Sequence, residues 1–148
     1  MEPYVYSNIQ IFKIWKGNIL KDVLTNKINK IMDKLNFVFL IKDDHCWEEL
    51  FSHIINLKKQ PAMTDKIAVI SIGTALLSCL KSTHLDTTKS TITYLNNENV
   101  EFYQCTNTLS RYGIDEKMLL PEISIAREGG LMKVAYFESM GYHSFTLC

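Results

Sequence analysis

The residue best placed for covalent chemistry is Cys105, which follows the strand-like run 100–104 and precedes a short helix-like segment. A thiol at the start of a helix lies beside free backbone N–H groups, which stabilise its thiolate, and the thiolate is the nucleophile. Thr106, Asn107 and Thr108 add polar donors around the sulfur. The opposing interpretation is a packing residue, because free cysteines are among the most buried side chains. Cys105 is therefore the candidate catalytic residue, and the three residues after it are candidate substrate-binding residues.

The other three cysteines, Cys46, Cys79 and Cys148, are widely and irregularly spaced. Because the chain has no Cys-x-x-Cys and no cysteine–histidine pairing at metal spacing, the sequence predicts neither a metal site nor a disulfide framework. Cys79 is expected in the core. Cys46 follows two aspartates whose charges oppose a thiolate. Cys148 is expected to be accessible, and it is the one resolving partner available if Cys105 is instead a redox sensor.

A second group of candidates comes after another apolar run, 66–72. The backbone amides of Gly73 and Thr74 could help to bind a small anion, although a glycine required by a tight turn explains the pattern equally well. The sequence 128–130, Glu-Gly-Gly, has the same ambiguity before the last predicted helix. The chain contains no dinucleotide-binding or phosphate-binding glycine motif. Among the histidines, His84 is the best candidate to assist a thiol.

The segments that must position these residues alternate between short apolar runs and longer amphipathic stretches. Strands are predicted at 35–41, 66–72, 100–104, 122–126 and 143–147, and helices at 47–59, 74–80, 85–97, 106–112 and 128–140. This alternation predicts an α/β fold, a three-layer α/β/α arrangement with a mostly parallel five-stranded sheet. Cys105 and Gly73 would then share the carboxyl edge of the sheet, where such folds bind ligands. In the last helix, Leu131, Val134, Ala135 and Met140 are expected to face inward.

The predicted α/β domain spans residues 35–148, and residues 1–34 form an extension expected to be helical and packed on the core. The extension carries an apolar stripe of Ile19, Leu20, Val23, Leu24, Ile28, Ile31 and Met32. Sixteen basic and sixteen acidic residues cancel, which argues against nucleic-acid binding as the main function. No apolar run is long enough to cross a membrane, and the N-terminus does not resemble a signal peptide. A cytoplasmic protein is expected.

The stretch 100–109, Val-Glu-Phe-Tyr-Gln-Cys-Thr-Asn-Thr-Leu, resembles the cysteine-bearing segment of the DsrE/DsrF-like family. In that family a strand runs into Cys-x-Asn and a short helix. The downstream order of segments is also similar: Leu119-Leu120-Pro121 precedes a strand, and Gly130 leads into a helix that ends at Gly141-Tyr142. The resemblance extends from near Leu35 to the end of the chain.

The resemblance implies a three-layer domain that assembles into trimers or hexamers and relays sulfur. At the position of Cys105, characterised relatives carry a persulfide, which they take from a sulfur-donor protein and pass to an acceptor without a cofactor. This chain departs from the family in having Thr106 where many relatives have glycine, and in its extension at 1–34. The alternative function is a non-catalytic oligomeric module that binds a small anion or a partner protein, with Cys105 as part of a pocket wall.

Overall fold

The computed structural model describes residues 33–82 and 86–148, together with Lys21 and Leu24. The chain divides into two compact units, Met1–Lys34 and Leu35–Cys148. Lys21 and Leu24 have helical backbone and exposed side chains, whereas the rest of the apolar stripe expected in the first unit lies outside the described residues. The candidate histidine of the loop, at position 84, lies outside them as well.

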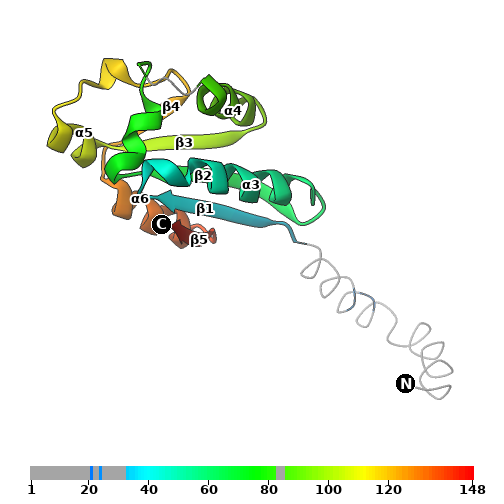
Figure 1. Ribbon diagram of the computed structural model, residues 1–148. Helices are drawn as coiled ribbons and strands as arrows, with labels where there is room; N and C mark the ends of the chain where they lie inside the picture. The colour runs from blue at the N-terminus through cyan, green and yellow to red at the C-terminus, as the bar shows by residue number, and fades with distance from the viewer. Residues whose placement is uncertain (1–20, 22–23, 25–32, 83–85) are drawn as a thin grey trace, which may run out of the picture. The chain divides into compact units, whose positions relative to one another are not determined.

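The second unit is built on a five-stranded sheet in which all strand pairs are parallel. The strands are β1 (Leu35–Ile41), β2 (Thr64–Ser71), β3 (Val100–Cys105), β4 (Ile123–Ala126) and β5 (His143–Leu147). They lie in the order β4-β3-β2-β1-β5 (Figure 1). The predicted α/β fold and its five-stranded sheet are confirmed. Because β1 and β2 are covered on both faces, they can be apolar at almost every position, which is why the sequence marked them clearly.

Helical segments connect the strands. The α-helices are α3 (Trp47–Lys58), α4 (Asp86–Asn97), α5 (Thr106–Tyr112) and α6 (Gly130–Ser139), and the 3-10 helices are η1 (Asp44–Cys46), η2 (Gly73–Cys79) and η3 (Glu116–Met118). The helix expected at 74–80 is thus a tighter 3-10 segment. It begins at a positive-φ glycine, Gly73 (φ 57°), and the N–H of Ala75 bonds to the carbonyl of Ile72 rather than to one a full α-turn away.

The helices form layers on both faces of the sheet. On one face, Leu50 and Ile54 of α3 and Ile92 and Leu95 of α4 belong to the same buried cluster as Phe102 of β3. On the other face, Phe137 of α6 packs with strand residues from β1 and β2. The domain is therefore a three-layer α/β/α sandwich, with α6 covering the face onto which the side chain of Cys105 also projects.

The inward face of α6 differs from the expectation. Leu131, Ala135 and Met140 are exposed, and the residues that turn toward the sheet are Gly130, Val134 and Phe137. Spacings of four and three residues place these last three on one side of the helix. The prediction is confirmed for Val134 and wrong for Leu131, Ala135 and Met140. It failed for these three because the helix is apolar on more than one side, so hydrophobicity alone did not indicate which side the sheet covers.

Candidate functional site

Cys105 lies where β3 ends and α5 begins, and it is the N-cap residue of α5. Its side chain is largely buried, with 5% of the residue surface exposed. The backbone N–H of Gly130, the first residue of α6, donates a hydrogen bond to Sγ of Cys105 with an N···S distance of 3.2 Å. The sulfur therefore lies between the starts of two helices, where backbone donors and the helix dipoles favour negative charge.

The surroundings of Cys105 lower the pKa of its thiol. Burial acts in the opposite direction and is the largest single influence, but hydrogen bonds from the backbone and hydroxyl of Thr108 and from the backbones of Gly130 and Asn107 outweigh it. The N–H of Gly73 donates in turn to the hydroxyl oxygen of Thr108, at 3.4 Å. This second contact fixes the hydroxyl that faces the sulfur. A larger fraction of Cys105 is therefore in the thiolate form at neutral pH than for an ordinary cysteine.

Two consecutive glycines allow α6 to approach the thiol. Gly129, the N-cap of α6, has φ 94°, a backbone conformation that other residues rarely adopt. A Cβ on Gly130 would lie 2.5 Å from Cγ2 of Ile72 and 3.3 Å from Cβ of Cys105. Only glycine at 130 therefore leaves room for its N–H to reach the sulfur. The sequence left the Gly-Gly pair ambiguous, and the structure supplies its physical reason.

Cys105 opens onto a pocket of about 430 Å³, called here the Cys105 pocket. Its lining comprises Lys42, Ile72, Gly73, Cys105, Asn107, Thr108, Arg111, Glu128, Gly129, Gly130, Leu131 and Met132. Sequence reasoning did not select the two cations as site residues, because Lys42 is distant from Cys105 in the sequence and Arg111 lies six residues beyond it. The sequence could have indicated them only through their positions: Lys42 directly follows β1 and Arg111 lies on α5, and both positions are at the carboxyl edge of the sheet.

Three of the five predicted substrate-binding residues, Gly73, Asn107 and Thr108, line this pocket, and Thr74 and Thr106 do not. Thr106 is the half-buried first residue of α5. The hydroxyl of Thr74 accepts a hydrogen bond from the N–H of Asp44 (3.3 Å) and donates to a carboxylate oxygen of Asp43 (3.2 Å). Thr74 therefore holds the loop after β1.

A second cavity, of about 370 Å³, lies beside β1 and β5 and is lined mainly by apolar side chains such as Phe37, Phe39 and Phe145. It contains one titratable side chain, His53, and no cysteine. This cavity suits an apolar ligand or another protein surface rather than covalent chemistry. The Cys105 pocket, which combines a nucleophile with charged and hydrogen-bonding groups, is therefore the candidate functional site.

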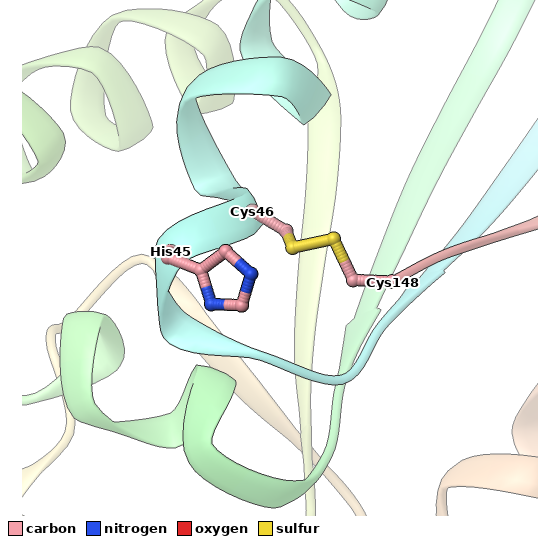
Figure 2. A group of neighbouring side chains, drawn as sticks. All are labelled: His45, Cys46 and Cys148. Carbon is pink, nitrogen blue, oxygen red and sulfur yellow. A yellow bond between two sulfur atoms is a disulfide. The ribbon is translucent and has the colours of Figure 1, made fainter.

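The remaining cysteines are arranged differently from the expectation in one respect. Cys79 is completely buried, and burial raises the pKa of its thiol to about 12. Cys46 and Cys148, which were expected to be unpaired, are joined by a disulfide with a Cα–Cα distance of 6.4 Å (Figure 2). The expectation was wrong because the two residues are 102 positions apart, and only the parallel pairing of β1 with β5 brings the segments beyond these strands together.

The strand order also bears on the redox-sensing alternative. Cys105 ends β3 and Cys148 comes directly after β5, and two strands, β2 and β1, lie between them. At roughly 4.8 Å per strand, three spacings separate the two positions by about 14 Å. A disulfide requires Cα atoms within about 7 Å. Cys148 is therefore out of reach of Cys105 in this fold.

Within the part of the chain that the structure describes, none of the helices has both the length and the apolar character needed to span a bilayer.

No known family model matches the sequence, and no curated protein matches it. Among solved structures, the fold is similar to that of MTH1491, a protein of unknown function from Methanobacterium thermoautotrophicum. The TM-score is 0.70 at 20% sequence identity, and the match covers 77% of this chain and 100% of the other. At this identity the similarity concerns the fold alone.

Proposed function

We propose that this protein is a sulfur carrier that receives sulfane sulfur on Cys105 and passes it to an acceptor. The observation that carries the proposal is the hydrogen bond from the N–H of Gly130 to Sγ of Cys105, in a site where several such donors lower the thiol pKa. Donors that stabilise a thiolate also stabilise the terminal anionic sulfur of a persulfide if that sulfur projects into the same site.

The transfer needs no external oxidant or reductant. The Cys105 thiolate attacks the outer sulfur of a donor persulfide, R–S–SH, forming an S–S bond to Cys105 and breaking the S–S bond of the donor. The donor leaves as the thiolate R–S⁻ and takes a proton from solvent, and Cys105 becomes Cys–S–SH. In the second half of the cycle, an acceptor thiolate attacks the outer sulfur, and the Cys105 thiolate is regenerated as the leaving group.

The pocket supports this chemistry through charge as well as hydrogen bonds. Lys42 and Arg111 line it together with Glu128, so two cations and one carboxylate surround the space in front of the sulfur. The cations favour the approach of an anionic persulfide. The fixed hydroxyl of Thr108, which faces the sulfur of Cys105, donates without having to reorganise during the reaction.

Intact-protein mass spectrometry after incubation with a persulfide donor tests the proposal. The wild-type chain should gain the mass of one sulfur atom at Cys105, and a thiol acceptor should remove it. The Cys105→Ser variant should gain nothing. Replacement of the buried Cys79 by alanine is the matched control and should leave the sulfur gain in place. Sulfur that still adds to Cys105→Ser would refute the assignment.

The second candidate function is a non-catalytic module that binds a small anion, and the observation that favours it is the pair of cations Lys42 and Arg111 in the pocket. This function predicts that Cys105→Ser retains anion binding, whereas Arg111→Gln loses it. Isothermal titration with thiosulfate distinguishes the two functions, because an anion-binding module would bind thiosulfate without any sulfur adding to Cys105.

The proposal includes assembly into a homo-oligomer, a trimer or hexamer, through α6. Leu131, Met132, Tyr136 and Met140 present 50% to 69% of their surface to solvent, and Met132, Tyr136 and Met140 recur every four residues along one side of the helix. Because Leu131 and Met132 also line the Cys105 pocket, a second subunit on this face would adjoin the thiol. Light scattering should show that the wild type is an oligomer and that the double variant Met132→Lys, Tyr136→Lys is a monomer. A monomeric wild type would contradict the proposed assembly.

The proposed setting is the cytoplasm, where sulfur donor and acceptor proteins are kept reduced and a persulfide can be exchanged between thiols. Fractionation of cells that produce the full chain should place it with the soluble cytoplasmic proteins. Recovery in an oxidising compartment would contradict this part of the proposal.

A further inference from the structure

Three metal-binding side chains meet at the carboxyl edge of the sheet, beyond β1 and β5. A ring nitrogen of His45 and the sulfurs of Cys46 and Cys148 all lie within 4.8 Å of one another. Figure 2 shows the imidazole beside the Cys46–Cys148 disulfide, with His45 and Cys46 coming from one turn of chain and Cys148 from the far end of the molecule's sequence. His45 and Cys148 are exposed and Cys46 is buried, so the group is open to solvent on one side.

The turn that carries two of these ligands is held in place. His45 and Cys46 belong to η1, and Asp44 in the same turn accepts a hydrogen bond from the Ser78 hydroxyl. The Thr74 hydroxyl bonds to the backbone of Asp44 and to the carboxylate of Asp43. The ligands are therefore presented by a segment tied to η2 rather than by a free loop.

We propose that His45, Cys46 and Cys148 bind a zinc ion when the disulfide is reduced. Two thiolates and one imidazole form a donor set that selects thiophilic cations over Mg²⁺ or Ca²⁺. Three protein ligands with a solvent molecule in the fourth position is a common tetrahedral zinc arrangement. The exposed side of the group leaves room for that fourth ligand. The proposed zinc site lies beyond β1 and β5, whereas Cys105 ends β3, and it does not depend on the function proposed for that residue.

Formation of the site is a balanced redox and proton exchange. Two thiols, which are oxidised to a disulfide, or one phosphine, which is oxidised to a phosphine oxide with the oxygen of water, supply two electrons. The Cys46–Cys148 S–S bond breaks, and each sulfur takes up one proton. Zn²⁺ then displaces these two protons, and the neutral imidazole of His45 contributes a lone pair. A low-molecular-weight disulfide reverses the process: it oxidises the two protein thiolates back to the S–S bond and is itself reduced to two thiolates, which take up protons from solvent, and Zn²⁺ is released.

The geometry allows this exchange without rebuilding the fold. In a tetrahedral complex with Zn–S bonds of about 2.3 Å, the two sulfurs lie about 3.8 Å apart, further than in a disulfide. Cys148 comes after the last paired residue of β5, Leu147, and therefore lies outside the ladder, so its side chain can turn without breaking sheet hydrogen bonds. The carboxylates of Asp43 and Asp44, which directly precede His45 in the sequence, add negative charge that favours a bound cation.

Zinc titration of the full chain under anaerobic conditions tests the site. The protein is reduced with a phosphine, the reductant is removed, and Zn²⁺ is added in competition with a chromophoric chelator. Reduced wild type should bind one Zn²⁺ per chain that the oxidised protein does not bind. Co²⁺ should give the intense visible bands of a tetrahedral ion and a thiolate-to-metal charge-transfer band.

The variants separate this site from other thiols. Cys148→Ser, a change at an exposed position, should abolish the binding, and His45→Ala should raise the Kd by at least about 10-fold, since loss of even a supporting outer partner costs that much. His53→Ala and Cys105→Ser are the matched histidine and cysteine controls and should keep the ion. Equal Zn²⁺ binding by oxidised and reduced protein, or retention in both Cys148→Ser and His45→Ala, would overturn the proposal, as would loss of the ion in Cys105→Ser.

Discussion

Replacement of Gly130 by alanine should raise the pKa of Cys105 and slow its reaction with electrophiles at neutral pH. The added Cβ would lie 2.5 Å from Cγ2 of Ile72 and 3.3 Å from Cβ of Cys105. Because real Cβ atoms do not approach neighbours at 2.5 Å, either the Ile72 side chain or the start of α6 must shift, and we expect α6 to move away from the sheet because Cγ2 is attached directly to Cβ of a branched, packed side chain. The N–H of residue 130, now 3.2 Å from the sulfur, would move with it, and the thiolate would lose one of the donors that lower its pKa.

The size of the effect is set by the strength of that contact. A hydrogen bond to a charged group contributes about 1.5–3 kcal/mol. At a pH below the thiol pKa, complete loss of this bond therefore lowers the thiolate-to-thiol ratio of Cys105 by about 10- to 150-fold. A more basic thiolate is intrinsically more nucleophilic, with a Brønsted coefficient of about 0.4–0.5, which offsets nearly half of this on a logarithmic scale. The alkylation rate should therefore fall roughly 4- to 16-fold.

The assay is the pH dependence of alkylation by iodoacetamide, measured by intact mass on the oxidised protein. Cys46 and Cys148 are then blocked by their disulfide, and Cys79 is fully buried, so the signal reports Cys105. In wild type the rate should rise with pH through a midpoint below that of an ordinary cysteine, because the pKa is lowered. In Gly130→Ala the midpoint should move to higher pH.

A matched control separates the local effect from general destabilisation. Gly141→Ala places a Cβ at φ 90° with no heavy atom within 4 Å, just beyond the other end of α6, so it strains the backbone without touching the thiol. Overpacking at 130 is expected to cost about 1–3 kcal/mol of stability, which thermal unfolding would report. A folded Gly130→Ala that keeps the wild-type midpoint would refute the role given to this N–H, as would an equal shift in Gly141→Ala.

Contacts at the thiol and in the core give three further predictions. Thr108→Val removes the hydroxyl that faces the sulfur of Cys105 and should raise the pH midpoint of Cys105 alkylation. Thr106→Val, at the first residue of the same helix and outside the pocket lining, should leave that midpoint unchanged. Equal midpoints in the two variants would contradict the role given to the Thr108 hydroxyl. Burial raises the pKa of Cys79 to about 12, so this thiol should resist alkylation in the native protein at about pH 8 and react only after denaturation, which peptide mapping would show. Rapid labelling of Cys79 in the native protein would mean that the core is open. Trp47→Phe removes an indole N–H that donates a buried 3.0 Å hydrogen bond to a backbone carbonyl. Urea unfolding should show a free energy of unfolding lower by about 1–3 kcal/mol, and an unchanged value would contradict a stabilising role for that contact.

Local patterns predicted much of the scaffold. The apolar runs that became β1 and β2 stand out because strands in a covered parallel sheet need no polar face, and the end of α5 is marked by Gly113, which has φ 64° at the C-cap. Where a pattern was less selective, the prediction failed. The side of α6 that contacts the sheet was assigned wrongly because its exposed side, with Leu131 and Met140, is as apolar as its buried one.

Local sequence patterns also predicted part of the candidate site. Cys105 could be placed at the carboxyl edge of the sheet because a strand-to-helix junction is a local property of the chain. Thr108 and Asn107 could be inferred from their places in the next helical turn. Lys42 and Arg111 were not selected, since a single cation on a loop or short helix carries no periodic signal that relates it to a thiol elsewhere.

The sequence by itself determined that Cys105 is a thiol at the start of a helix, and which segments form strands and helices. The tertiary structure decided what meets that thiol: the N–H of Gly130, 25 residues further along, reaches the sulfur because α6 packs across the face of β3. It likewise decided that Cys46 and Cys148 are joined across 102 residues, because β5 pairs with β1 rather than with β4. Local chain chemistry specifies the elements, whereas contacts between distant residues depend on which strands pair and which helix face is covered.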